Sequence, residues 1–215
     1  MHIYAFGSVC RGEIDHSSDV DLLAVVATAD GRFDPLKFSV YSYERIRVLW
    51  REGNPFAWHL FREARLLYAD DGRDFLRFSE PGAYTNALGD CVKFRQIFVG
   101  AADALRNGSA SPVFELATAF LAIRNVAICF SLGCSSEAVF ARDAALMIGE
   151  HSLVVEPSRY AILSAARVLS TRGTGRCPTP NEIESLVVRF DHILSWMDDL
   201  ISVARGQNER VCKPG

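Results

Sequence analysis

The sequence lacks the cysteine and histidine patterns that build zinc sites. It contains six cysteines in 215 residues, but no two of them form a Cys-x-x-Cys pair. No pair of its five histidines has zinc-finger spacing either, so the common zinc motifs are excluded. We expect the scattered cysteines to be buried thiols of an intracellular protein, and Cys10 to fill space rather than to act as a nucleophile with His16.

Long apolar runs and export signals are also missing. No run of about 18 uncharged apolar residues occurs, so we expect no membrane span. The first residues enter a predicted strand directly and do not resemble a secretory signal. We therefore expect a cytoplasmic protein. Whether the natural chain starts further upstream stays open.

An excess of positive charge is missing as well. The formal net charge is −3, without a basic tail, which gives no strong nucleic-acid signal. We found no internal repeats and no heptads long enough for a coiled coil. Hydrophobic residues make up 49% of the chain, so a folded core is expected and disorder is not.

A glycine–serine turn follows the first predicted strand, which covers residues 3–6. Gly7 can take backbone angles closed to other residues, and Ser8 supplies a hydroxyl and a backbone N–H. If residues 9–13 start a helix, their open N–H groups form an anion site. Arg11 can add a charge-assisted hydrogen bond to a phosphate. The turn therefore predicts a phosphate site.

Two carboxylates open the second predicted strand. Asp19 and Asp21 are separated by one residue, so their side chains point to the same face of the strand. Two carboxylates at this spacing can bind divalent cations jointly, and Mg²⁺ suits oxygen ligands shared with substrate phosphates. The opposite face is expected to pack on the core, through Val20, Leu22, Ala24 and Val26.

These residues carry a family resemblance. The sequence resembles the nucleotidyltransferases of the DNA polymerase β superfamily, above all the small members with a helical C-terminal domain, such as antibiotic and minimal nucleotidyltransferases. The motif covers about a tenth of the chain and consists of Gly7, Ser8, Gly12, Ser18, Asp19, Asp21 and Leu22.

The resemblance implies an activity and a cofactor. It implies that a nucleoside monophosphate moves from a nucleoside triphosphate to a hydroxyl, with pyrophosphate leaving. ATP is the expected donor, and the acceptor would be a small molecule, a protein or an RNA. Mg²⁺ or Mn²⁺ would be held by Asp19 and Asp21. The nucleotide would be bound by Gly7, Ser8, Arg11, Gly12 and Ser18.

Active members of this family usually carry a third carboxylate on a later strand. Here the third predicted strand, residues 36–42, has no acid on either face. Asp34 and Glu44 flank it, and Glu115 lies in a predicted helix further along the chain. Any of these three could complete the site. The alternative is a degenerate protein that binds nucleotide or a partner without catalysis, and a purely structural helical adaptor is a third hypothesis.

The periodicity of the chain changes near residue 80. We predict a small mixed-sheet α/β domain over residues 1–80, a helical bundle over 81–206 and a tail over 207–215. Because no helix precedes the first strand, one sheet face is expected to be less covered, which favours a homodimer or a partner protein. His59 is predicted to be an ordinary packing or surface residue. The bundle helices are predicted over residues 84–106, 112–132, 135–149, 158–170 and 181–205.

Overall fold

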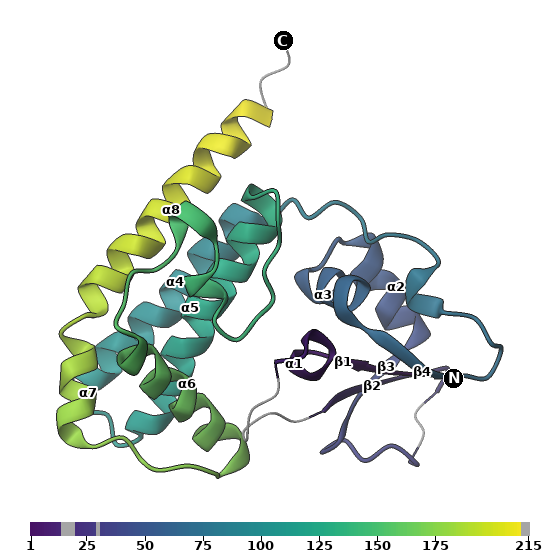
Figure 1. Cartoon of the computed structure of the whole chain (residues 1–215). Helices are drawn as coiled ribbons and strands as arrows, with labels where there is room; N and C mark the ends of the chain where they lie inside the picture. The colour runs from purple at the N-terminus through teal and green to yellow at the C-terminus, as the bar shows by residue number, and fades with distance from the viewer. Residues whose placement is uncertain (14–19, 29–30, 212–215) are drawn as a thin grey trace. The chain divides into compact units, whose positions relative to one another are not determined.

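The computed structural model describes residues 1–13, 20–28 and 31–211 (Figure 1). The chain divides into two compact units, Met1–Thr85 and Asn86–Gly215, where the sequence predicted a boundary between residues 80 and 81. The first unit holds a four-stranded sheet with helices, and the second is helical. The predicted fold class, a small α/β domain followed by a helical region, is confirmed.

The sheet has the strand order β3-β2-β1-β4. β1 pairs antiparallel with both β2 and β4, whereas β2 and β3 are parallel, so the sheet is mixed. In chain order the first unit contains β1 (His2–Phe6), α1 (Ser8–Arg11), β2 (Asp21–Val26), β3 (Phe38–Ser42), α2 (Tyr43–Arg51), α3 (Pro55–Glu63), β4 (Arg65–Ala69) and the 3₁₀ turn η1 (Phe75–Arg77).

Helices α2 and α3 cover one face of this sheet (Figure 1). Leu23 and Val25 of β2 pack there against Ile46 and Leu49 of α2. This corrects the predicted sidedness of β2, because the larger core lies on the face of Asp21 rather than on the opposite one. That opposite face buries Ala24 and Val26 with Phe33, while Val20 is 52% exposed.

Local capping explains where α2 and α3 begin. The Ser42 hydroxyl accepts a hydrogen bond from the Arg45 N–H at 3.1 Å, which makes Ser42 the N-cap of α2. The Asn54 side chain accepts from the Phe56 N–H at 2.9 Å, and Pro55 occupies the first position of α3. With these two caps the chain passes directly from β3 into α2 and then into α3. These two helices pack on the sheet and form the larger core of the first unit.

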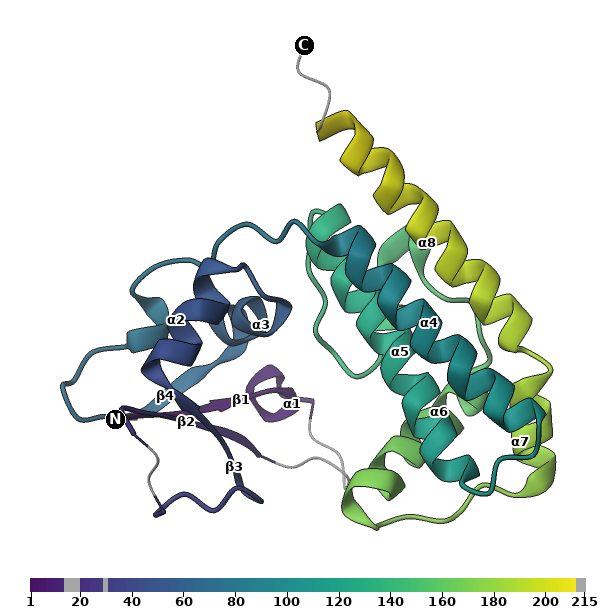
Figure 2. The ribbon, with the colours of Figure 1, turned by 180° about the vertical axis from the view of Figure 1, so that it is seen from behind.

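The second unit is built around one apolar helix, which packs against three others (Figure 2). α5 is apolar on almost every side, and such a helix is stable in water only when its neighbours bury it. α4, α6 and α8 bury it here. The second unit contains α4 (Ala87–Arg106), α5 (Pro112–Cys134), the 3₁₀ turns η2 (Ala144–Leu146) and η3 (Gly149–His151), α6 (Pro157–Arg172), α7 (Pro180–Val187) and α8 (Phe190–Val211).

α5 also meets the length and hydropathy that a membrane-spanning helix needs, alone among the helices of the described residues. Its most apolar window is 61% buried inside the bundle. Core helices of folded domains have the same length and composition, so this is weak evidence for a span.

Two of the predicted bundle helices are wrong. Residues 135–149 form no α-helix, and side chains of α5 form hydrogen bonds with the backbone of this segment. The Arg124 guanidinium donates to the carbonyls of Phe140 and Ala141 at 3.0 and 3.1 Å, and the Ser131 hydroxyl accepts from the Val139 N–H at 3.1 Å. Only η2 and η3 form there, together with irregular turns.

The last predicted helix, residues 181–205, is two helices that break between Val187 and Phe190. α7 begins at a capping box, in which Thr179 and Glu182 bond to each other's backbone N–H groups. α8 then continues to Val211, so most of the predicted tail from residue 207 is helical.

Candidate functional site

The glycine–serine turn joins β1 to the short helix α1. Gly7 has φ 78° and ψ −153°, a conformation essentially restricted to glycine, and it is followed at once by Ser8 in the helix. The Cys10 N–H donates to the Gly7 carbonyl at 3.0 Å, which closes the first turn. The N–H groups of Ser8 and Val9 lie ahead of this bond, at the positive end of the helix.

Asp21 lies directly beside this turn. Phe6 is its partner across the β1–β2 pair, so Gly7 continues β1 past the start of β2. The Asp21 carboxylate rests on the Cα of Gly7, where a Cβ would overlap its Oδ2 atom. Backbone and pairing register thus bring Gly7, Ser8 and Asp21 together, as the motif predicts.

Asp19 and Ser18 lie outside the described residues, as does His16. The described chain resumes at Val20, and Asp21 is the first residue of β2. Among the described residues no three His, Cys, Asp or Glu side chains form a group that could hold a metal ion. The described residues therefore place one carboxylate, that of Asp21, beside the turn, and the two-carboxylate metal site stays a prediction.

Arg11 is engaged by two carboxylates. Its Nε donates to Glu13 at 2.8 Å, and its Nη1 donates to Oε2 of Glu63 at 2.5 Å. The same Glu63 oxygen lies 2.9 Å from Nε2 of His59, one turn earlier on α3. His59 was expected to be an ordinary packing or surface residue, and its ring packs beside Phe6. It also belongs to an ion-pair cluster that anchors α1 to α3.

The charges of this cluster support one another. Burial alone would raise the pKa of Glu63, but the hydrogen bond with His59 and the charges of His59 and Arg11 outweigh it and lower that pKa. Burial likewise opposes the charge on Arg11, yet its bonds to Glu13 and Glu63 raise the pKa of the guanidinium. The arrangement keeps Glu63 and Arg11 ionised at the edge of the larger core of the first unit.

The Cys10 thiol is kept protonated. Burial is the largest cause of its raised pKa, and the charges of Glu63 and Asp21 add to it against those of Arg65 and Arg11. A nucleophilic cysteine needs a lowered pKa, so this environment supports the space-filling role expected for Cys10.

Arg65 is a functional candidate that the sequence analysis missed. It opens β4 opposite Ala5, two residues before Gly7, and its charge acts on Cys10 in α1. Its side chain is exposed and makes no ion pair within the described residues, in contrast to Arg11. A single arginine at the start of a strand carries no local signal, since only the β1–β4 pairing brings it to the turn.

The structure does not bring Glu44 to Asp21. Glu44 follows Ser42, whose register partner is Val26 at the far end of β2, about 17 Å along the strand from Asp21. Its side chain is exposed and lies 3.8 Å from Arg47. The prediction that Glu44 completes this site is therefore wrong.

The other two candidate acids are placed differently. Asp34 lies in the turn before β3, at the same end of the sheet as Asp21, where its carboxylate accepts the Leu36 N–H at 2.9 Å. Glu115 lies in the first turn of α5, within the second unit. Gly12 ends α1 at φ 78° and ψ 12°, with open space around it.

No protein-family model matches the chain, and no curated protein is significantly similar to it. A glycine turn at the start of a helix, an adjoining carboxylate and an exposed arginine together suit a phosphate group that carries a divalent cation.

Proposed function

We propose that the first unit, Met1–Thr85, is a nucleotidyltransferase domain that binds a nucleoside triphosphate with Mg²⁺ at the Gly7–Ser8 turn. The observation that carries this proposal is the contact between the Asp21 carboxylate and the Cα of Gly7. A metal ligand is thereby fixed beside backbone N–H groups that suit a phosphate, and the two belong together in a metal–triphosphate site.

Each residue at the turn has a proposed role. The N–H groups of Ser8 and Val9 bind the triphosphate, and the exposed guanidinium of Arg65 neutralises part of its charge. Asp21, with Asp19, holds Mg²⁺, whose hard-cation chemistry fits carboxylate oxygens and would withdraw charge from the reacting phosphate. Arg11 positions α1 through Glu63 rather than contacting phosphate.

The proposed reaction is a displacement at the α-phosphorus. The acceptor hydroxyl oxygen forms a bond to that phosphorus, the bond to the bridging oxygen of the β-phosphate breaks, and pyrophosphate leaves with the electron pair. The hydroxyl proton passes to a base, for which Asp21 is the carboxylate that lies beside the turn. The acceptor is a small molecule, a protein or an RNA.

The test uses each of the four nucleoside triphosphates with a radiolabel on the α-phosphate. The protein is incubated with Mg²⁺ or Mn²⁺ and a cell extract as the source of acceptors, and both label transfer and pyrophosphate release are measured. We expect transfer from ATP, and a loss of at least about 100-fold in Asp21→Asn. Glu44→Gln is the matched control, because it removes a carboxylate at the other end of the sheet.

The alternative function is binding of a metal–nucleotide complex without turnover. The observation that favours it is that no three His, Cys, Asp or Glu side chains of the described residues form a group that could hold a metal ion. Calorimetry with ATP and Mg²⁺ separates the two functions. Binding that depends on Asp21 without transfer to any acceptor would establish the alternative, whereas transfer that is equal in Asp21→Asn and the wild type would exclude both.

A further inference from the structure

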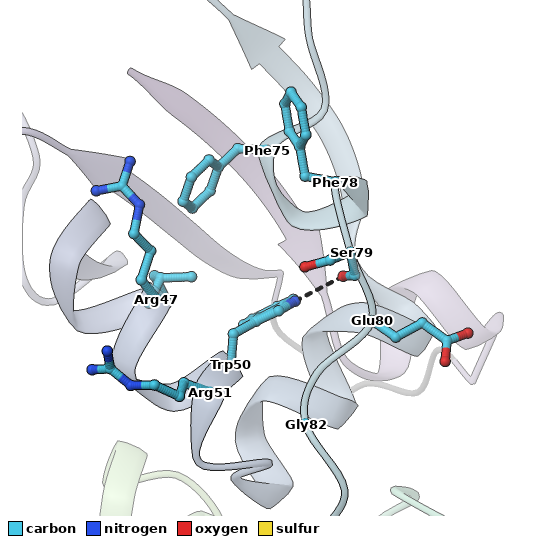
Figure 3. Close-up of a pocket in the computed structure, with 9 residues that line it drawn as sticks. Arg47, Trp50, Arg51, Phe75, Phe78, Ser79, Glu80 and Gly82 are labelled. Carbon is cyan, nitrogen blue, oxygen red and sulfur yellow. Dashed lines mark hydrogen bonds between the residues drawn. The ribbon is translucent and has the colours of Figure 1, made fainter.

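A second candidate site lies in the first unit, away from the Gly7–Ser8 turn. It is a cavity of about 540 Å³ on the outer side of α2, a size typical of small-molecule sites. None of its residues belongs to α1, β2 or the cluster around Arg11. Its lining consists of Ile46, Arg47, Trp50, Arg51, Phe75, Phe78, Ser79, Glu80 and Gly82 (Figure 3).

The floor of the cavity is apolar and has no unsatisfied donor. Trp50 is buried, and its indole N–H donates to the Ser79 carbonyl at 3.0 Å. The ring therefore offers its apolar surface to the cavity, beside the buried Ile46. A ligand placed here gains apolar contact without breaking a hydrogen bond of the protein.

The loop that closes the cavity is held tightly to α2. The Gly82 N–H donates to the Trp50 carbonyl at 2.7 Å, and the Gly82 carbonyl accepts from the Trp58 indole at 3.0 Å. A Cβ on residue 82 would lie 2.8 Å from the Arg51 carbonyl oxygen, so only glycine allows this approach. The cavity is therefore largely formed before any ligand binds.

The aromatic wall is held just as firmly at Phe75. Its ring meets that of Tyr43 edge-on, with 4.9 Å between centroids, and it also contacts the His2 ring. The turn η1 is tied down by Asp74, which accepts hydrogen bonds from the Leu76 N–H and the Tyr4 hydroxyl. Phe78, by contrast, is 69% exposed and offers a free ring surface.

Two arginines give this aromatic cavity a positive edge. Arg47 and Arg51 are one turn apart on α2, and Figure 3 shows the Glu80 carboxylate directed away from both. Arg47 stands 5.6 Å from the centre of the Phe75 ring and has only a loose, exposed contact with Glu44 at 3.8 Å. Arg51 makes no ion pair anywhere in the described part of the chain.

We propose that this cavity binds a small aromatic acid, a planar ring that carries a carboxylate or a phosphate. The ring lies against Trp50 and Phe78, and the anionic group binds the guanidinium of Arg51 with help from Arg47. The aromatic wall selects a flat apolar body, and the uncompensated arginine selects one negative end. This site shares no residue with the proposed nucleotide site, so it stands whether or not that proposal holds.

The test follows the indole N–H signals of the full chain in nitrogen–proton correlation spectra. Of the three tryptophans, Trp50 lines the cavity and Trp58 bonds to its rim, while Trp196 lies in the second unit and serves as an internal control. Naphthoate is titrated first. We expect the Trp50 signal to shift in a saturable way and the Trp196 signal to stay in place.

Related probes and variants define the chemistry. Naphthamide and cyclohexane carboxylate should each bind at least about tenfold more weakly than naphthoate, and naphthyl phosphate shows which anion is preferred. Arg51→Gln should weaken naphthoate by about tenfold. Phe78→Ala, at an exposed position, should weaken it by at least about threefold, whereas Arg45→Gln on the same helix should have no effect.

Three results would overturn the proposal. The first is the absence of any Trp50 shift up to about 5 mM naphthoate. The second is equal affinity for naphthoate and naphthamide, and the third is unchanged naphthoate affinity in Arg51→Gln. The spectra themselves report whether each variant is folded, and Asp21→Asn should bind naphthoate as the wild type does.

Discussion

The carboxylate of Asp21 occupies the space that a Cβ on Gly7 would need. The Asp21 carboxylate can therefore take this position only because residue 7 has no side chain. Gly7 ends β1 with positive φ, and Asp21 begins β2 opposite Phe6. The close contact between turn and carboxylate follows from the register of two paired strands.

Replacing Gly7 with alanine should disrupt this contact and cost more stability than the same change at Gly12. Both residues have φ 78°, but Gly12 has left-handed helical ψ and open space around it. We expect Gly12→Ala to lower the free energy of unfolding by about 1 kcal/mol and Gly7→Ala by about 3 kcal/mol. Urea unfolding measures both. Equal losses would show that the carboxylate does not crowd residue 7.

The Arg11–Glu63 pair should contribute stability that depends on pH. Its side chains are mostly buried, so Glu63→Gln leaves Arg11 partly uncompensated and should cost about 3 kcal/mol near neutral pH. The exposed control Glu44→Gln should cost less than about 0.5 kcal/mol.

The sign of the pH dependence follows from the lowered pKa of Glu63 in the folded protein. A carboxyl group with a lowered folded pKa stabilises the fold fully above its unfolded pKa, and this stabilisation is lost as the pH falls through the folded pKa. The difference in unfolding free energy between wild type and Glu63→Gln should thus be largest near neutral pH. It should shrink below about pH 4.5, and a difference that grows there would contradict the assignment.

Cys10 should react slowly with thiol reagents despite its position in the turn that we propose to bind phosphate. Its raised pKa leaves little thiolate at neutral pH, whereas Cys177 is exposed. Timed alkylation with iodoacetamide, read by peptide mass spectrometry, should label Cys177 well before Cys10. Cys10→Ser should also retain any nucleotide transfer, and a loss comparable to that of Asp21→Asn would instead place the thiol in the chemistry.

Features that depend on neighbouring residues, such as the turns at the ends of strands and helices, could be predicted from the sequence. The turn at Gly7 depends on residue types adjacent in the chain, and it was predicted. The prediction of a helix over residues 135–149 was wrong, and in the structure Arg124 on α5 donates to two carbonyls of that segment. Such a contact cannot be recognised from the spacing of the apolar residues in the segment itself.

The residues of the candidate site likewise fall into two groups, those that the sequence predicted and those that it did not. Gly7, Ser8 and Asp21 belong to a motif that lies within a short stretch of sequence, so the pattern contained their relation. Glu63 is far from Arg11 in the sequence, and Arg65 reaches the turn only because β4 pairs with β1. The Arg11–Glu63 contact and the position of Arg65 were both missed, since contacts between residues far apart in the sequence cannot be read from one segment alone.

Arg65, rather than Arg11, should determine the affinity for nucleotide. Arg65 is exposed and without an ion pair among the described residues, so its charge is available to a phosphate, whereas Arg11 already binds Glu13 and Glu63. Arg65→Gln should raise the dissociation constant for ATP with Mg²⁺ by about tenfold, measured by calorimetry, and leave stability nearly unchanged. Arg73→Gln, beyond the other end of β4, is the control and should alter neither quantity.

The matching experiment on Arg11 separates a phosphate contact from a positioning role. Arg11→Met alone should destabilise the protein, because it leaves the Glu63 carboxylate buried beside His59 without its arginine. In the double variant Arg11→Met with Glu63→Leu, packing replaces the ion pair and should restore much of the stability. ATP affinity in this double variant should stay within about threefold of the wild type. A tenfold loss that persists there would mean that Arg11 contacts the phosphates after all.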